Sequence, residues 1–230
     1  MILQRLVCLA IGVIFAGQIW AAEPESPASP PENQFKARIG VEIGYDQEFR
    51  SARLRGERVL SGDQYRIYVA PESGDGYVYI ITIDDTNATF MTTPEPMTLT
   101  SNELFMLPAL NASPPFYQVK NDISTFAIVI VCSVEKLPEL AESLPRATIP
   151  VKEWQHIEQA LNSTHNIELF DQLPEKPWTL AGGTRSIETL KDARPQALPR
   201  PIVAFVNDLK ISSGETLVIK RYEFRVHAQK

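Results

Sequence analysis

The chain has 230 residues, enough for one large domain or two small ones. Its 44% hydrophobic and 22% charged residues are ordinary globular values, which excludes global disorder. The formal net charge is −6, and no cluster of lysine and arginine stands out against that acidic balance, so we do not expect the protein to bind nucleic acid.

Residues 1–22 are predicted to be a secretory signal peptide. Arg5 supplies the positive start, residues 6–19 form the apolar stretch, and Ala21 and Ala22 provide the small-residue exit, with cleavage after either alanine. An uncleaved anchor is the alternative, but the apolar segment is at the lower limit of length for a bilayer span. We therefore expect a periplasmic or secreted protein with no stable membrane span after signal cleavage.

A proline-rich tether is predicted at residues 23–34. Proline fixes the φ angle and donates no backbone hydrogen bond, so this run favours an extended, solvated chain. The remaining residues, 35–230, are expected to form a single β-rich globular domain.

Strand patterns dominate the start of that domain. Apolar and polar residues alternate from 39 to 45, which is typical of a half-buried strand. Residues 65–70 and 77–83 are rich in β-branched and aromatic side chains. The Asp-Gly pair at 75–76 predicts a hairpin between them. A second reversal at 84–88 would complete a β-meander.

Residues 126–134 are apolar at nearly every position, which predicts a central strand that is covered on both faces. Cys132 lies in this run and is the only cysteine left after signal cleavage, so no internal disulfide forms and a buried, apolar role is expected. Further strands are predicted at 116–119, 202–206 and 217–226. In the last of these, Tyr222, Phe224 and Val226 should point inward.

Two helices are predicted, at residues 135–144 and 150–161. The second places Trp154, Ile157 and Leu161 on one face. Together these patterns predict a mainly β fold, an antiparallel β-sandwich-like domain with one or two short helices.

Five pieces of sequence follow one another between about residue 60 and residue 140. They are Leu-Ser-Gly-Asp-Gln-Tyr-Arg-Ile at 60–67, Asp-Gly-Tyr-Val-Tyr-Ile-Ile-Thr-Ile at 75–83, Phe-Met-Leu-Pro at 105–108, the apolar run at 126–133, and Leu-Pro at 137–138. In this order they resemble a bacterial domain of unknown function, family 4384. The chain departs from the family at residues 89–94, where a Leu-Phe-Pro-like ending is usual. The resemblance implies an exported, non-catalytic β module from bacteria, of a kind often joined to kinase or peptidase domains, with no known ligand.

Catalytic and metal-binding patterns are weak. His156 and His165 are too far apart in sequence to share a helix face as metal ligands. Ser163 and His165 have the residue types of a serine hydrolase but no nucleophile elbow. The glycine-containing loop at 182–186 lacks the ending of a phosphate-binding P-loop. We therefore predict no catalytic residue, metal ligand or cofactor.

Two groups of residues have both a structural and a functional interpretation. Asp84 and Asp85 could belong to a calcium or glycosidase site. A turn role is favoured, because an aspartate side chain stabilises a turn by hydrogen bonding to the backbone beside it. Tyr65, Tyr77 and Tyr79 are candidate binding residues: exposed, they would form a platform for a sugar or peptide, and buried, they would belong to the core. The core interpretation is favoured.

The functional hypothesis is an exported, non-catalytic binding or assembly module that acts on another cell-envelope or secreted protein. The alternative is a secreted hydrolase or a carbohydrate-binding protein whose site is assembled from distant loops. An enzymatic role is the less favoured of the two.

Overall fold

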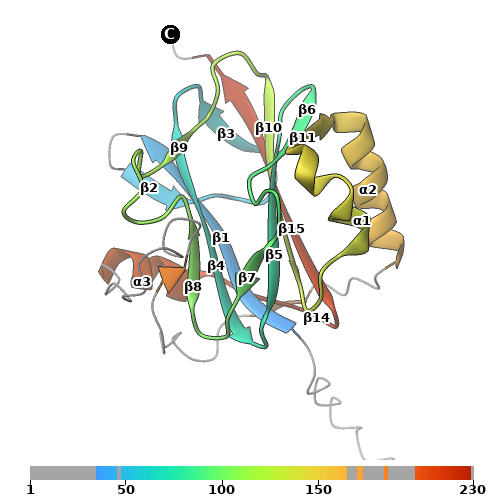
Figure 1. The fold of residues 1–230 in the computed structure, drawn as a ribbon. Coiled ribbons are helices and arrows are strands. Elements are labelled where there is room, and N and C mark those ends of the chain that lie inside the picture. The colour runs from blue at the N-terminus through green and yellow to red at the C-terminus, as the bar shows by residue number, and fades with distance from the viewer. Residues whose placement is uncertain (1–34, 46–47, 165–169, 173–183, 186–199, 229–230) are drawn as a thin grey trace, which may run out of the picture. The chain divides into compact units, whose positions relative to one another are not determined.

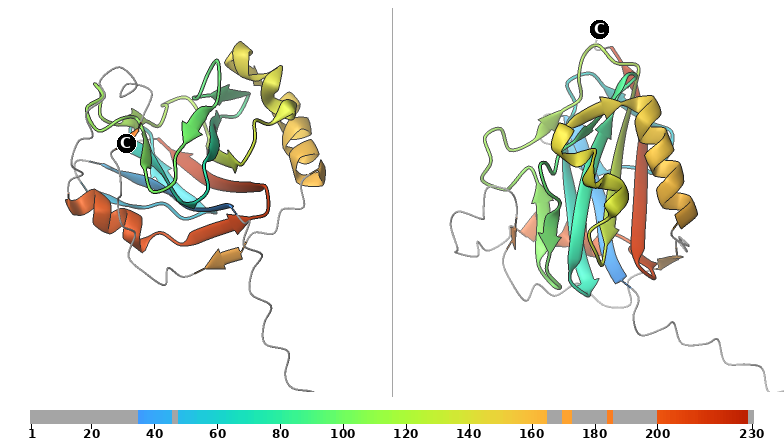
Figure 2. Two further views of the ribbon diagram at one scale, coloured as in Figure 1. Left: turned by 60° about the horizontal axis from the view of Figure 1, so that its bottom comes forward. Right: turned by 45° about the vertical axis from the view of Figure 1, so that its right-hand side comes forward.

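The protein is described here by a computed structural model. Two β-sheets pack face to face, and helices cover part of the outer face of each (Figures 1 and 2). The predicted mainly β, sandwich-like fold is thereby confirmed. The predicted signal peptide and proline-rich tether lie outside the described residues, which are 35–45, 48–164, 170–172, 184–185 and 200–228.

The first sheet has the strand order β12-β14-β1-β4-β8-β13, with β2 paired to β1 and β9 paired to β4. Its longest pairing is antiparallel and joins β1 to β4. Its strands are β1 (Phe35–Tyr45), β2 (Glu48–Ser51), β4 (Gln64–Ser73), β8 (Leu104–Leu107), β9 (Tyr117–Gln118), β12 (Phe170–Gln172), β13 (Thr184–Arg185) and β14 (Ile211–Gly214).

The second sheet has the order β11-β6-β5-β10-β15-β3, with β7 paired to β5. Its edge strand β3 runs parallel to β15, whereas the other pairings in this sheet are antiparallel. Its strands are β3 (Glu57–Leu60), β5 (Gly76–Ile83), β6 (Asn87–Phe90), β7 (Met97–Leu99), β10 (Thr125–Ser133), β11 (Thr148–Pro150) and β15 (Leu217–His227).

Two helices cover the outer face of the second sheet and one covers the outer face of the first. The two helices predicted from the sequence are both present, although the first is short. No helix among the described residues has the length and apolar character to cross a membrane. The helices are α1 (Pro138–Ala141), followed by the 3-10 turn Leu144–Arg146, then α2 (Val151–Thr164) and α3 (Arg200–Asp208).

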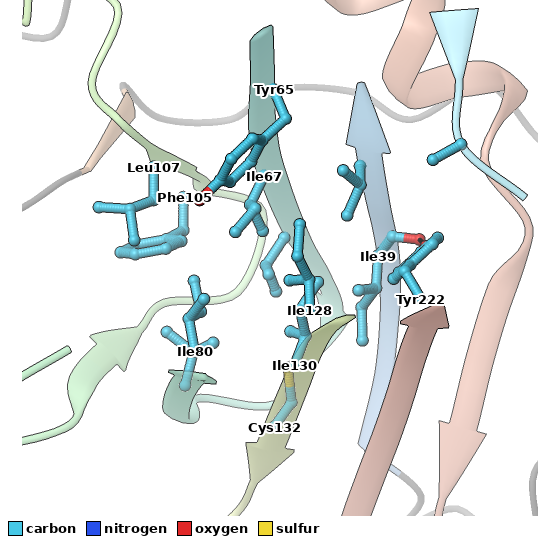
Figure 3. Packing of buried hydrophobic residues seen from close by; sticks show 14 of the residues in the cluster. Ile39, Tyr65, Ile67, Ile80, Phe105, Leu107, Ile128, Ile130, Cys132 and Tyr222 are labelled. Carbon is cyan, nitrogen blue, oxygen red and sulfur yellow. Dashed lines mark hydrogen bonds between the residues drawn. The ribbon is translucent and has the colours of Figure 1, made fainter. Parts of the chain in front are cut away.

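The central strand of the fold is β10, as the sequence predicts. Eight of its residues are buried, and it lies between β5 and β15. Its even-numbered residues, such as Ile128 and Ile130, pack between the two sheets (Figure 3). Its odd-numbered residues, such as Val129, pack beneath α1 and α2. Because both faces are covered, this strand fixes the layering of the domain.

A buried hydrogen bond also links the two sheets. The Tyr222 hydroxyl, on β15, donates to the carbonyl oxygen of Ile39, on β1, at 3.0 Å (Figure 3). Tyr222 and Phe224 are buried on this face, while Glu223 and Arg225 on the opposite face are exposed. The inward and outward alternation predicted for the last strand is confirmed.

The strand predicted at residues 202–206 is wrong, because these residues lie in α3. Ile202 and Val206 are four residues apart and are both buried against the outer face of the first sheet. Pro201 is at the start of the helix, where its missing N–H is tolerated. A five-residue apolar run does not by itself distinguish a helix from a strand.

The hairpin predicted around Asp75 and Gly76 is also wrong. Strand β4 pairs with β1 and β8, whereas β5 pairs with β10, so this connection crosses from one sheet to the other. Positive φ falls at Gly74, and Gly76 instead approaches β10 so closely that a Cβ atom would lie 2.3 Å from the Ser133 carbonyl oxygen. The reversal predicted at 84–88 is confirmed, since β5 and β6 form an antiparallel pair.

The link between the sheets gives a stability prediction. Tyr222→Phe should lower the free energy of unfolding by about 1–2 kcal/mol, because it removes a buried hydrogen bond and leaves the ring in place. Urea denaturation measures this change. Tyr45→Phe is the control, since Tyr45 is 55% exposed and its loss of a hydroxyl should change stability by less than about 0.5 kcal/mol. Equal effects of the two substitutions would contradict the prediction.

Candidate functional site

The structure does not bring the three candidate tyrosines together. Tyr65 lies in the core between the sheets. Tyr79 is buried on the outer face of the second sheet, where its hydroxyl accepts a hydrogen bond from the Leu137 N–H at 2.7 Å. Tyr77 is partly buried beside the same cluster. The core interpretation therefore holds for Tyr65 and Tyr79, and the three side chains form no common platform.

The weak hydrolase pattern is only partly within the described residues. The Ser163 hydroxyl donates to the Ala160 carbonyl oxygen at 3.0 Å, within α2. His165 lies outside the described residues, and His156 and His227 are exposed on separate elements. Of this pattern the structure therefore describes Ser163 alone, and its hydroxyl is bonded to the backbone of α2.

Other predicted positions have structural roles or lie outside the described residues. Cys132 is fully buried, and burial raises the pKa of its thiol, which agrees with the apolar role predicted for it. Of the loop 182–186, only Thr184–Arg185 is described, as β13. Over the described ranges, no group of three or more His, Cys, Asp or Glu side chains is placed to hold a metal ion.

The two neighbouring aspartates act as turn residues. Asp84 accepts hydrogen bonds from the backbone N–H groups of Thr86 and Asn87, and it pairs with Lys120 at 3.0 Å. Burial acts to raise the pKa of Asp84, but these donors outweigh it and bring the pKa to about 2. Asp85 accepts from the backbone N–H groups of Ser124 and of the next residue. Both carboxylates are thus engaged within the chain.

The described surface does carry a cluster of arginines, so the expectation that no basic cluster stands out is wrong. Residues 50–58 contain four arginines and one glutamate, a formal charge of +3 in a chain of formal charge −6. A fifth arginine comes from β15, which pairs with β3. We call these five residues the arginine patch: Arg50, Arg53, Arg55, Arg58 and Arg225.

The patch lies where the chain crosses the edge of the sandwich. Strand β2 pairs with β1 in the first sheet, and β3 pairs with β15 in the second, so residues 52–56 pass from one sheet to the other. Ala52 is buried and its N–H donates to the Val41 carbonyl oxygen at 2.8 Å, which fixes the start of the crossing. The residues that follow are exposed as far as Gly56, which has a φ of +70°.

A nearly buried carboxylate holds this crossing in shape. Glu57, whose side chain is 8% exposed, accepts from Arg50 Nη2 at 2.7 Å and from the Arg53 backbone N–H at 3.1 Å. Burial acts to raise the pKa of Glu57, but the hydrogen bonds from Arg50 and Arg53 outweigh it, so the pKa is below its ordinary value. One negative charge therefore organises the loop and leaves the other guanidinium groups free to face solvent.

Two arginines of the patch are neighbours with no counter-charge. Arg58 and Arg225 are register partners on β3 and β15, so their exposed side chains project from the same face of the sheet. No ion pair among the described residues involves either of them, nor Arg53 or Arg55. Like charges in directly opposed positions destabilise a sheet. The fold therefore maintains a local repulsion that an anion could relieve.

The edge of β3 is poorly suited to adding another strand. The Ser61 N–H donates to the His227 carbonyl oxygen, so the amides of Arg58 and Leu60 point away from β15. The Leu60 amide is already bonded to the Asp63 carboxylate at 2.8 Å. Strand β3 is only four residues long, one of its outer amides is already hydrogen-bonded, and it carries an exposed arginine. These features protect a sheet edge from pairing with another strand. A ligand would therefore be bound mainly by side chains.

Exposed leucines accompany the arginines. Only four large apolar side chains are exposed over the described ranges, and two of them, Leu54 at 39% and Leu60 at 43%, lie in or next to the segment that carries the patch. Surfaces that combine arginine with large apolar side chains are typical of protein–protein contacts.

Two hollows adjoin the patch and share Gly56. The first, of about 500 Å³, is lined by three patch arginines and by Glu57. The second, of about 460 Å³, lies over β5, β10 and β15 beside α2, and Arg225 lines it. Its size falls within the range of small-ligand sites.

Searches of protein-family models, of curated proteins and of solved structures found no match to the chain. The resemblance over residues 60–140 therefore remains a prediction, and the arginine patch lies mostly before that region. The signal for the patch is present in the sequence, as four arginines within nine residues, but an overall acidic charge obscures it.

The first prediction from the patch concerns acid stability. Because the folded pKa of Glu57 is below its ordinary value, near 4.5, the carboxylate stabilises the fold above that pH and ceases to do so as the pH falls through the folded pKa. Glu57→Gln should therefore be less stable than the natural protein at pH 7, and the difference should shrink below about pH 4.5. Urea denaturation between pH 3 and pH 7 measures it.

Glu48→Gln is the control, because Glu48 is exposed on β2 and makes no ion pair within the described chain. It should follow the natural protein at every pH. A stability loss in Glu57→Gln that does not change with pH would show that the carboxylate charge is not what holds the crossing.

The second prediction concerns the repulsion between Arg58 and Arg225. Arg225→Gln should raise the free energy of unfolding by about 0.2–1 kcal/mol at low salt, with a smaller gain at high salt where charges are screened. Arg221→Gln is the matched control: Arg221 lies four residues before Arg225 on the same face of β15 but pairs with Glu158 and Glu223, so its loss should destabilise the protein. A loss of stability in both variants would refute the claim that Arg225 lacks a counter-charge.

Proposed function

We propose that the protein is an exported, non-catalytic binding or assembly module, and that its arginine patch contacts another cell-envelope or secreted protein. The observation that carries this proposal is the set of exposed arginines without ion-pair partners among the described residues, held at the sandwich edge by Glu57. Guanidinium groups bind carboxylates in a bidentate manner, so acidic side chains are the natural counterpart.

A protein partner accounts for the patch better than a nucleic acid does. Nucleic-acid surfaces need extended positive charge to displace counterions along the phosphates, and the chain as a whole is acidic. The exposed leucines at positions 54 and 60 offer apolar contact that a phosphate backbone would not use. The predicted signal peptide supports a partner outside the cytoplasm.

The proposal is tested by crosslinking in intact cells that express the tagged full chain, followed by affinity purification and mass spectrometry. Arg55→Gln/Arg58→Gln should abolish or strongly reduce the partner that crosslinks to the natural protein, because it removes two unpaired charges from the contact. Lys36→Gln/Lys210→Gln is the matched control, since it removes equal charge from β1 and from the residue before β14, and it should leave the crosslink unchanged.

Equal recovery of every crosslinked protein with both double variants would show that the patch is not the contact surface. Circular dichroism and urea denaturation of the purified variants establish that a lost crosslink is not caused by unfolding.

A further inference from the structure

The two hollows that share Gly56 differ in what they offer a ligand. In the first, the guanidinium groups of Arg53 and Arg58 have no ion-pair partner among the described residues. Glu57 pairs with Arg50 and also attracts the charge of Arg53, but three arginines and one glutamate leave the hollow with a net positive charge, which suits carboxylates.

Three charged residues that line the second hollow, Arg221, Asp84 and Asp85, already have partners within the chain. Arg221 pairs with Glu158 and Glu223, both at 2.8 Å. Asp84 is bonded to Lys120, and Asp85 accepts hydrogen bonds from the backbone of β10. A further charged group entering this hollow would therefore find little compensation for its lost hydration.

Apolar atoms line part of the second hollow. Ile83, Ala127 and Val151 contribute to its wall, and the exposed Gln155 stands at its side on α2. An apolar side chain of a ligand that contacts these three residues would lose water-exposed area without displacing the hydrogen bonds of Arg221, Asp84 or Asp85. The two hollows thus favour a carboxylate and an apolar side chain respectively.

Gly56 lies where the two hollows meet. A Cβ atom built on it would have no other atom within 4 Å, so the space above this residue is open. Arg58 lines the first hollow and its register partner Arg225 lines the second, so positive charge extends across the junction. An extended chain could pass over Gly56 from one hollow to the other.

Resting on the proposed function, we propose that the partner presents an extended acidic segment followed by a large apolar residue, with its carboxylates on the arginine patch and the apolar side chain in the second hollow. The complementarity of charge in the first hollow and of apolar area in the second defines this class of ligand.

The test compares two synthetic peptides for binding to the full chain by fluorescence anisotropy at physiological salt. One carries four Asp or Glu residues followed by Leu-Phe, and the other replaces Leu-Phe by Ser-Ser. The natural protein should bind the Leu-Phe peptide about ten-fold or more tightly than the Ser-Ser peptide, because one large apolar side chain is buried. Both affinities should fall as salt is added.

Gly56→Asn places a side chain in the open junction, and asparagine tolerates the positive φ of this residue. It should remove the advantage of the Leu-Phe peptide and leave the affinity for the Ser-Ser peptide within about two-fold. Gln155→Trp fills the second hollow from an exposed position and should also remove the advantage of the Leu-Phe peptide. This variant provides the test if Gly56→Asn does not fold. Arg58→Gln/Arg225→Gln should weaken both peptides by about ten-fold.

Equal binding of the two peptides, or variants at Gly56 and Gln155 that leave the preference intact, would overturn this inference and leave the proposed function standing. If neither peptide binds, or if binding does not depend on the arginines, both the inference and the proposed function are contradicted. Tighter binding of inorganic polyphosphate or single-stranded DNA than of either peptide would overturn the inference in favour of a phosphate polymer.

Discussion

The fold depends on one constraint, which is that β10 is apolar on both faces. A strand of this kind is stable only when it is paired on both edges and covered on both sides. Here β5 and β15 provide the pairing, the first sheet covers one face, and α1 and α2 cover the other. The arginine patch lies outside this closed middle, at the crossing from β2 to β3 on the edge of the sandwich.

The crossing between β2 and β3 combines order with unsatisfied charge. Glu57 is nearly buried and bonded to Arg50 and to the Arg53 backbone, so the loop has a defined shape. The neighbours Arg58 and Arg225 nevertheless lack a counter-charge among the described residues. A surface selected only for stability would place a carboxylate opposite one of them, as Glu158 and Glu223 are placed around Arg221. This contrast within one strand is the physical basis for assigning the patch a binding role.

Much of the fold, but little of the site, could be predicted from the sequence. Alternation in β15 and the uninterrupted apolar run of β10 gave correct strands, because burial determines these patterns directly. The run at 202–206 was too short to separate a helix from a strand, and the connection after β4 resembled a hairpin although it joins different sheets. The net charge of the whole chain hides a local group of arginines, so the sequence analysis did not predict the patch. The pairing of Glu57 with Arg50 and the position of Arg225 beside Arg58 depend on tertiary contacts, which the sequence alone does not show.

An NMR titration of the protein, labelled at arginine, with a glutamate-rich peptide tests whether the arginine patch binds carboxylates. We expect the guanidinium Nε–H signals of Arg53, Arg55, Arg58 and Arg225 to shift together and saturably, while that of Arg221, already held by two glutamates, shifts little. Shifts spread evenly over all arginines, or confined to residues outside the patch, would contradict this expectation.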